Sequence, residues 1–406
     1  MEDQNRLVLY RNARLVRGGT VADILVEGER VHSVGANLVG PAAGVREEDL
    51  GGMLVLPGAI DCHVHFREPG ASHKADWATE SAAAAAGGVT SVLDMPNNEP
   101  PATRHEVMQE KRSIAGRASR VDHGFFMGYD GANIQAVVAE KNIPGVKVYM
   151  NTTTGGMELG DEKRLLPLFG YTGRVAVHAE GETLALALRL AKQAGRRDLY
   201  ITHVPTRHEL GVIEREKDLR VYVEATPHHL FLTGTDTAHL GGFADMKPPL
   251  GAEADRQALW EALVSGRVDT VATDHAPHTR EEKRQSPWPA GVPGIQFMLP
   301  LLLNEVNNGA LTLSRLVEVL CENPAAVYGI RNKGAIAPGM DADLVVVDMH
   351  LEREITDDLV LSKCGWTPYA GRRLRGWPVR TLVRGREVFP EHEAGDAGGR
   401  ELRFGD

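Results

Sequence analysis

The sequence predicts an α/β protein whose main unit is a (β/α)8 TIM barrel, with a small β-sandwich domain formed from the N- and C-terminal segments. Between residues 56 and 332, short β-branched or aromatic runs alternate with helical patterns, whereas both ends of the chain carry strand-like runs without helices between them. A chain of 406 residues also exceeds the roughly 250–300 residues at which a single core stops growing. We therefore predict a composite β-domain over 1–55 and 333–406 and a barrel domain over 56–332.

Eight runs in the middle of the chain indicate barrel strands. Each is short and apolar, and helical patterns such as 78–86, 182–194 and 253–264 lie between them. A doubly wound open sheet is the alternative, but it usually carries a glycine-rich nucleotide fingerprint after its first strand, which this sequence lacks. The predicted strands end at His65 or span 89–95, 124–129, 146–150, 175–179, 199–204, 221–226 and 268–273.

The two ends of the chain resemble each other more than they resemble the barrel. Short alternating runs broken by glycines favour antiparallel strands, and we infer that the two ends meet in one small β-domain. The tail after Phe389 is rich in Glu, Gly and Asp, a composition typical of a loose segment. The predicted terminal strands span 7–16, 22–27, 31–34, 342–347 and 379–388.

Composition and charge narrow the class of protein. A net charge of −10 argues against a nucleic-acid or anionic-membrane surface, and no apolar run approaches the ~20 residues of a membrane span. The polar, acidic start of the chain does not resemble a secretory signal, so we expect a cytoplasmic enzyme. The cysteines Cys62, Cys321 and Cys364 lie far apart, which leaves nitrogen and oxygen ligands for any metal.

Several predicted strands end in a side chain that can bind a metal ion. Barrel enzymes have their active sites at the carboxyl ends of their strands. His63 and His65 are two residues apart and project to one face of the first strand. His178 and His203 end the fifth and sixth strands, and Asp274 follows the eighth. Imidazole and carboxylate ligands suit Zn²⁺, and four histidines exceed the need of one open catalytic site, so two metals are implied. Ordinary core histidines are the alternative for each position alone.

Lys147 and Asp274 carry further chemistry in this interpretation. Burial of Lys147 in an apolar strand disfavours its charge, and carboxylation by CO₂ would turn it into a carbamate that bridges two metals. A lysine that reaches solvent is the alternative. Asp274 would ligate a metal and take a proton from the attacking water. Its alternative role is a helix N-cap ahead of Pro277.

Three residues near the predicted metals are candidates for binding substrate. Arg67 follows the first strand closely, and an arginine beside cationic metals is poorly placed unless it meets an anion, most simply a substrate carboxylate. A salt bridge to Glu68 or Asp94 is the alternative. Asn97, at the end of the second strand, and His278 are candidates for binding the same anion.

Several motifs in this order resemble the dihydroorotases of the amidohydrolase superfamily, in the branch that carries a lysine at the bridging position. The resemblance spans nearly the whole chain and implies the reversible, zinc-dependent cyclisation of N-carbamoyl-L-aspartate to L-dihydroorotate in pyrimidine biosynthesis. The motifs are Asp61-Cys62-His63-Val64-His65-Phe66-Arg67-Glu68-Pro69-Gly70, Asp94-Met95-Pro96-Asn97-Asn98, Val146-Lys147-Val148-Tyr149-Met150-Asn151, Thr273-Asp274-His275-Ala276-Pro277-His278 and Pro338-Gly339-Met340-Asp341-Ala342-Asp343-Leu344-Val345.

The resemblance also implies a role for each matched residue. Two zinc ions per subunit would be bridged by N-carboxylated Lys147 and a hydroxide, and Asp274 would be the catalytic base. The loop 152–156 would close over substrate or form an ordinary turn. Lys247 departs from the commoner Asn-Pro-Pro-Leu-Arg motif. The implied ligands are His63, His65 and Asp274 for one zinc and His178 and His203 for the other, with Arg67, Asn97 and His278 for the substrate carboxylate.

The resemblance leaves two rival functions and one candidate partner. An allantoinase or dihydropyrimidinase would keep the metals, but its substrate lacks the ring carboxylate that Arg67 would bind. A non-catalytic scaffold for aspartate carbamoyltransferase would lose metal ligands, and all six predicted positions are filled here. Some family members associate with aspartate carbamoyltransferase, which is therefore a candidate partner. A small-molecule substrate and a homo-oligomer are expected; nucleic acid and membrane are not.

Overall fold

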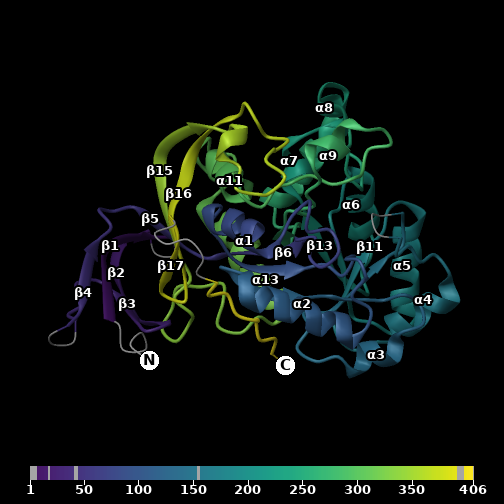
Figure 1. The fold of residues 1–406 in the computed structure, drawn as a ribbon, viewed down its shortest axis with the longest axis horizontal. Helices are drawn as coiled ribbons and strands as arrows, with labels where there is room; N and C mark the ends of the chain where they lie inside the picture. The colour runs from purple at the N-terminus through teal and green to yellow at the C-terminus, as the bar shows by residue number, and fades with distance from the viewer. Residues whose placement is uncertain (1–6, 17–18, 41–43, 153–155, 391–396, 406) are drawn as a thin grey trace.

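The computed structural model describes residues 7–16, 19–40, 44–152, 156–390 and 397–405. A ring of strands surrounded by helices forms the larger part of the molecule, and a broad sheet built from both ends of the chain lies beside it (Figure 1). The predicted combination of a TIM barrel with a small β-domain is confirmed.

The described residues form a closed barrel of eight parallel strands. Hydrogen bonds give the orders β6-β7-β8 and β9-β10-β11-β12-β13-β14. Only Phe126 separates β8 from β9, which together form the third barrel strand, and the His65 N–H donates to the His275 carbonyl at 2.8 Å to close the ring. The strands are β6 (Ala59–Val64), β7 (Val89–Asp94), β8 (Asp122–Phe125), β9 (Met127–Gly128), β10 (Val146–Tyr149), β11 (Val175–His178), β12 (Asp198–Ile201), β13 (Arg220–Ala225) and β14 (Thr270–Val271).

Helices cover the outside of the barrel, and side-chain caps fix where several of them begin (Figure 1). The Asp76 carboxylate accepts the Thr79 N–H at the start of α1. The helices are α1 (Trp77–Ala86), α2 (His105–Ala118), α3 (Ile134–Ala139), α4 (Glu162–Phe169), α5 (Glu182–Gln193), α6 (Arg207–Glu214), α7 (Pro227–Phe231), α8 (Gly234–Leu240), α9 (Glu253–Val264), α10 (Arg280–Arg284), α11 (Met298–Asn307), α12 (Leu313–Val317) and α13 (Asn323–Tyr328), with the short turns η2 (Gly241–Ala244), η3 (Glu318–Glu322) and η4 (Asp357–Leu359).

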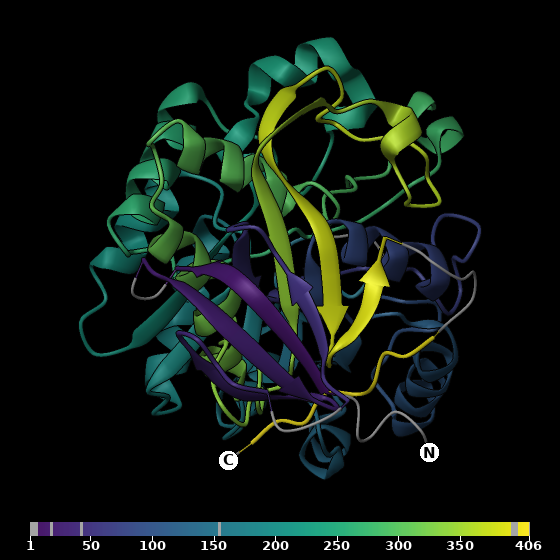
Figure 2. The same ribbon diagram turned by 90° about the vertical axis from the view of Figure 1, so that its left-hand side faces the viewer.

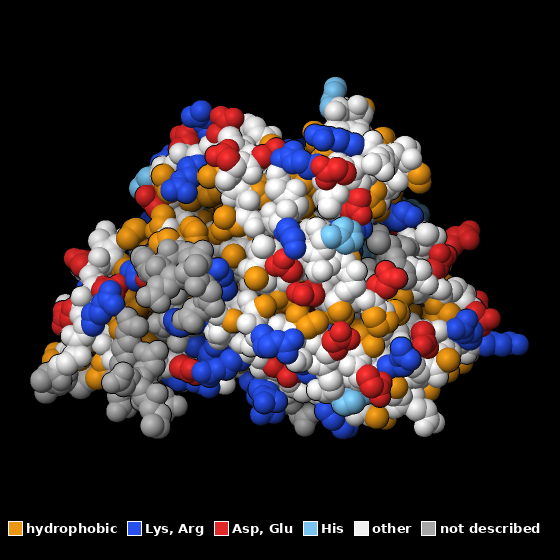
Figure 3. All heavy atoms as spheres, viewed as in Figure 1, with side chains coloured by type: hydrophobic (Ala, Val, Ile, Leu, Met, Phe, Trp, Pro, Cys, Tyr) orange, Lys and Arg blue, Asp and Glu red, His pale blue; other side chains and the backbone are white. Residues whose placement is uncertain are grey.

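Within the described ranges, no helix combines the length and apolarity needed to cross a membrane. Lys, Arg, Asp and Glu side chains are interspersed over the face that Figure 3 shows. Mixed charge of this kind is ordinary for a surface in contact with water.

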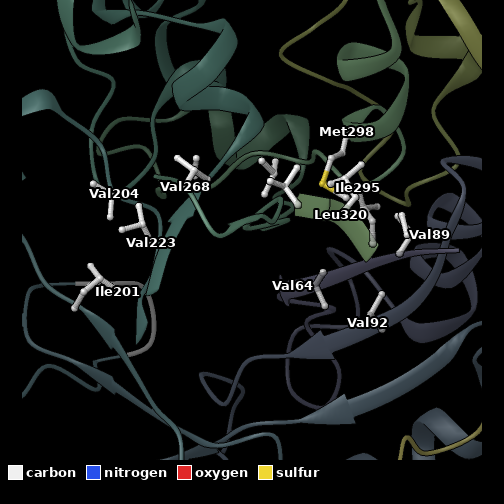
Figure 4. Packing of buried hydrophobic residues seen from close by; sticks show 14 of the residues in the cluster. Val64, Val89, Val92, Ile201, Val204, Val223, Val268, Ile295, Met298 and Leu320 are labelled. Carbon is white, nitrogen blue, oxygen red and sulfur yellow. The ribbon is translucent and has the colours of Figure 1, made fainter. Parts of the chain in front are cut away.

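Two apolar clusters hold the barrel together. The larger one joins strands to the surrounding helices, and Figure 4 shows Ile295, Met298 and Leu320 beside Val64 and Val89. A smaller cluster brings together side chains from strands on opposite sides of the ring and so fills its interior. Its members include Ile60, Cys62, Leu93, Phe126, Ala176, Tyr200 and Ala272.

Both ends of the chain contribute to the β-domain, as expected, but where a sandwich was predicted its strands form one hydrogen-bonded sheet of eight in the described residues (Figure 2). The order is β17-β16-β15-β5-β1-β2-β3, and β4 pairs with the first half of β1. The predicted boundary after residue 55 falls inside β5, and the limits of the domains stay a prediction. The strands are β1 (Leu7–Leu15), β2 (Val21–Glu27), β3 (Arg30–Gly35), β4 (Arg46–Asp49), β5 (Leu54–Pro57), β15 (Leu344–Glu354), β16 (Arg373–Val383) and β17 (Arg386–Phe389).

The prediction of a loose tail is wrong for residues 397–405. This segment packs against the N-terminal end of the barrel, where the His123 N–H donates to the Arg400 carbonyl and the Leu402 N–H donates to the His123 carbonyl. The Leu402 side chain is buried, and Arg112 pairs with Glu401 at 2.8 Å. Composition suggested disorder because the few anchoring residues are diluted by glycine and acidic residues.

Candidate active site

The carboxyl ends of the barrel strands bring the predicted metal ligands together. The Nε2 atoms of His63 and His65 lie 3.3 and 2.9 Å from Asp274 Oδ1. His178 Nδ1 lies 2.9 Å from His203 Nε2, and the rings of His63 and His203 are 5.3 Å apart, which joins the two groups. All five side chains are buried. His63, His65 and Asp274 also form a group whose ligand atoms lie within 4.8 Å of one another.

His63 and His65 each donate a hydrogen bond from Nδ1 to a residue outside the cluster, which directs their Nε2 lone pairs toward the centre of the cluster. His63 Nδ1 donates to Glu224 Oε1 at 2.7 Å, and His65 Nδ1 donates to Asn97 Oδ1 at 2.6 Å. Both Nε2 atoms are then acceptors, and they face another acceptor, the carboxylate of Asp274. Lone pairs that face each other at this distance repel unless a cation lies between them. The residues present therefore fit a metal ion, and the outer bonds are those that usually orient histidine ligands.

Burial keeps these groups in the protonation states that metal binding requires. It lowers the pKa of His65 to about 4 and lowers those of His178 and His203, so the imidazoles are neutral. Burial opposes ionisation of Asp274, whereas the imidazoles of His63 and His65, whenever they carry a proton on the side of the carboxylate, favour its charged form and hold the pKa of this carboxyl well below its usual range. The alternative of Asp274 as a helix cap is wrong, because Thr279 caps α10.

Lys147 lies inside the barrel and not at its surface, so the alternative of a lysine that reaches solvent is wrong. Its side chain is fully buried, and Nζ donates to Thr202 Oγ1 at 2.7 Å, directly before His203. Burial lowers the pKa of Lys147 to about 8, against the opposite effect of the carboxylates of Glu224 and Asp274. A partly deprotonated amine beside the imidazoles has the nucleophilicity that carboxylation requires.

Three site residues hold backbone conformations that are unusual for residues other than glycine. The φ angles are 63° at Arg67, 37° at His203 and 46° at Asp274. Such angles cost free energy, and they persist where the surrounding structure fixes them. Each of these residues turns its side chain at the point where a barrel strand passes into its loop, which places the side chain over the mouth of the barrel.

Arg67 and His278 lie together at one side of this mouth. The Arg67 guanidinium is buried, donates from Nε to the Pro277 carbonyl at 3.1 Å, and has Nη2 3.2 Å from His278 Nε2. The residues weighed as salt-bridge partners are engaged elsewhere: Glu68 accepts the Trp77 N–H, and Asp94 pairs with Lys111 at 2.7 Å. A buried guanidinium without these partners is suited to an anionic ligand.

Glu224 is the main site residue that the sequence interpretation missed. Besides holding His63, its carboxylate accepts the His203 N–H at 2.8 Å and the Tyr200 hydroxyl at 2.8 Å. Its signal was an acidic residue inside an apolar strand, the same feature that singled out Lys147, but the sequence interpretation used this feature only for the lysine. Of the predicted loop 152–156, residues 153–155 lie outside the described ranges, and Lys247 is exposed.

Comparisons with known proteins agree with this geometry. Residues 174–388 match the model described as "Amidohydrolase family" and residues 52–146 the model described as "Dihydro-orotase-like". A dihydroorotase from Halobacterium salinarum is 38% identical, over 95% of this chain and 97% of the relative. An allantoinase from Rubrobacter xylanophilus is 34% identical, over 94% of each. The solved L-hydantoinase (dihydropyrimidinase) of Arthrobacter aurescens has a TM-score of 0.91 at 29% identity, over 98% of this chain and 99% of that chain.

Proposed function

Because the chain belongs to the dihydroorotase-like branch of the amidohydrolase family, we propose that it is a hydrolase of cyclic amide C–N bonds that acts as a dihydroorotase. It interconverts N-carbamoyl-L-aspartate and L-dihydroorotate plus water, a step of pyrimidine biosynthesis. The observation that carries this choice is the buried Arg67 beside His278, next to the cluster of metal-competent side chains. The substrate carries the carboxylate that such a guanidinium would bind.

The donor set supports two zinc ions as the resident metals. His63, His65 and Asp274 would hold one ion, His178 and His203 the other, and a carbamate on Lys147 would bridge them. The Lys147 amine attacks CO₂ to form an N–C bond and releases one proton. When bound, zinc supplies a Lewis acid for the ring amide carbonyl and lowers the pKa of water.

The chain's own residues supply the proton transfer and the positioning of substrate. In ring opening, Asp274 takes the proton of the attacking water and passes it to the ring nitrogen as the C–N bond breaks. Arg67 binds the substrate carboxylate with His278 and Asn97, which fixes the ring amide over the metals. Cyclisation runs the same steps in reverse. A cytoplasmic location, a homo-oligomer and a complex with aspartate carbamoyltransferase stay predictions.

Allantoinase and dihydropyrimidinase are the rival activities, and relatives of both names are similar to this chain. Their neutral substrates would leave the Arg67 guanidinium without an anion in a buried position. Losing such a charge-assisted interaction costs roughly 1.5–3 kcal/mol. The buried arginine therefore favours an acidic ring as the substrate.

The test combines metal analysis of the purified protein with an ultraviolet assay of L-dihydroorotate ring opening. We expect about two zinc ions per chain and measurable turnover. Arg67→Ala should retain the metals but lower kcat/KM for dihydroorotate roughly 10- to 100-fold. Metal-replete wild-type protein that turns over allantoin or dihydrouracil, but not dihydroorotate, would overturn the proposal.

The carbamate has a separate readout. Protein loaded with zinc in ¹³C-bicarbonate should show a carbamate carbon resonance that is lost in Lys147→Met, which keeps an unbranched side chain of similar length. Lys363→Met, at an exposed lysine, should keep the signal. A wild-type protein that binds two metals without this resonance would contradict the bridging role of Lys147.

A further inference from the structure

Lys74 lies beside the Arg67–His278 pair, on the segment between β6 and α1. Its Nζ atom is 3.2 Å from His278 Nδ1 and 2.9 Å from Glu282 Oε1. The side chain is 16% exposed, so it reaches the site from its rim. No role for this residue follows from the motifs or from the metal ligands.

The contacts of His278 determine which ring nitrogen carries its proton. Nε2 lies 3.0 Å from the Ala290 carbonyl, which only accepts hydrogen bonds, so Nε2 carries the hydrogen. Nδ1 is then the acceptor, and Lys74 Nζ is the donor that faces it at 3.2 Å, nearer than the Glu282 carboxylate oxygen at 3.6 Å. Lys74 therefore holds the His278 ring in its Nε2–H form. The Trp366 indole N–H donates to the His278 carbonyl at 2.7 Å and fixes the backbone of the same residue.

With this tautomer, Arg67 Nη2 and His278 Nε2 are two donors 3.2 Å apart. Two N–H groups at this distance do not satisfy each other. An anion that binds between them can accept from Arg67 Nη2 and take over or share the Nε2–H that the Ala290 carbonyl accepts in this structure. A carboxylate oxygen is the simplest group that accepts from both. The pair is therefore preorganised for an anionic ligand only while Nδ1 of His278 stays the acceptor.

The charges around His278 are mostly positive. Lys283 is buried, and its Nζ donates to the carbonyls of Asp245, Pro289 and Gly291. These three hydrogen bonds give its ammonium group a structural role. Glu282 supplies the nearby negative charge, but its Oε2 also accepts the Thr279 N–H at the start of α10. Lys74 is thus the cation at the rim that can add its charge to that of Arg67 when an anion enters.

We propose that Lys74 is a specificity-determining residue that selects carboxylate-bearing cyclic amides over neutral ones. It acts by fixing His278 as the Nε2–H donor and by placing a second positive charge at the carboxylate-binding end of the site. The inference rests on the proposed function, because it takes the ligand at Arg67 and His278 to be the substrate carboxylate. The alternative is a lysine that only ties its loop to Glu282.

The experiment compares Lys74→Met and Lys74→Arg with wild type and with Lys363→Met. Lys363 is a matched control because it contacts the same segment, at Ser72 and Asp76, but lies outside the site. Zinc content and melting temperature are checked first. Steady-state kinetics on L-dihydroorotate then give KM and kcat, and inhibition by orotate and uracil compares one ring with and without a carboxylate.

We expect Lys74→Met to raise KM for dihydroorotate and the inhibition constant of orotate roughly 5- to 20-fold, with kcat within about 3-fold of wild type. Inhibition by uracil should not change. Lys74→Arg should recover most of the loss, and Lys363→Met should behave as wild type. Equal weakening of orotate and uracil, or a loss confined to the melting temperature, would overturn the inference and leave Lys74 a purely structural residue.

Histidine ¹⁵N NMR separates failure of the inference from failure of the proposed function. The His278 ring should be wholly Nε2–H in wild type and a mixture of tautomers in Lys74→Met. A wild-type enzyme that does not turn over dihydroorotate would refute the proposed function, whatever the tautomer. A tautomer unchanged in Lys74→Met, in an enzyme that does turn over dihydroorotate, would refute the inference alone.

Discussion

Glu224 connects the two groups of histidines that can bind a metal. Its carboxylate accepts hydrogen bonds from the ring Nδ1 of His63 and from the backbone N–H of His203. Glu224→Gln would keep the shape of the side chain but leave it one acceptor oxygen, whereas the carboxylate uses both of its oxygens to accept hydrogen bonds. Loss of such an outer partner typically costs 10- to 100-fold in metal affinity or activity, and we expect about that loss in zinc affinity. Glu140→Gln, a buried carboxylate paired with Arg112 away from the site, is the control. Equal zinc affinity in the two variants would contradict the role of Glu224.

At the residue scale, sequence spacing predicted which side chains meet but not what each one contacts. His63, His65 and Asp274 follow from the rule that strand ends converge at one mouth of a barrel. The side-chain oxygen of Asn97 accepts from His65, a contact that the spacing did not predict, and the role of Asn97 in binding substrate stays a prediction. Glu224 was missed because every residue in its half of β13 is buried, so the sequence does not reveal which side chains face the metals.

At the element scale, the barrel strands were predictable because each is an apolar run bounded by polar turns. Their positions in the structure lie within a few residues of the predicted spans. β4 was not predicted, because Arg46–Asp49 is charged throughout and pairs with β1 through its backbone. The packed tail at 397–405 was missed for a related reason. Backbone pairing with segments far away in the chain leaves little trace in local composition.

A substitution at Gly88, in the turn from α1 to β7, can test how closely the barrel packs against the terminal sheet. Gly88 has φ +77°, and an added Cβ would lie 2.7 Å from a Leu299 methyl group and 3.0 Å from one of Val345. Gly266 occupies a comparable turn with φ +86° and no atom within 4 Å. Both Ala variants pay about 1–2 kcal/mol for the left-handed conformation, and Gly88→Ala adds about 1–3 kcal/mol of overpacking. Urea unfolding should show the larger loss for Gly88→Ala. Equal losses of unfolding free energy would mean that the side chains of α11 and β15 near Gly88 move aside for the added methyl group at no cost.

At the scale of the whole molecule, burial of many histidines links folding to pH. In the described part of the chain, burial lowers the pKa of His65 and His229 to about 4 and that of His278 to about 2, and it also lowers those of His123, His178, His203 and His228. Unfolded histidines bind protons near pH 6.5. Below that pH the unfolded chain therefore holds more protons than the folded one, and acid favours unfolding.

We expect the free energy of unfolding of the metal-free protein to fall steeply between pH 6.5 and pH 5. Each histidine that stays neutral in the fold contributes up to about 1.4 kcal/mol per pH unit. Circular dichroism melts across this range measure the slope. His123→Asn removes one such group at the barrel base, away from the metal ligands, and should make the slope shallower. His32→Asn, at an exposed ring, should leave the slope unchanged. A melting temperature that stays constant from pH 7 to 5 would show that the folded chain takes up protons at these rings without unfolding, and that their burial does not set its acid limit.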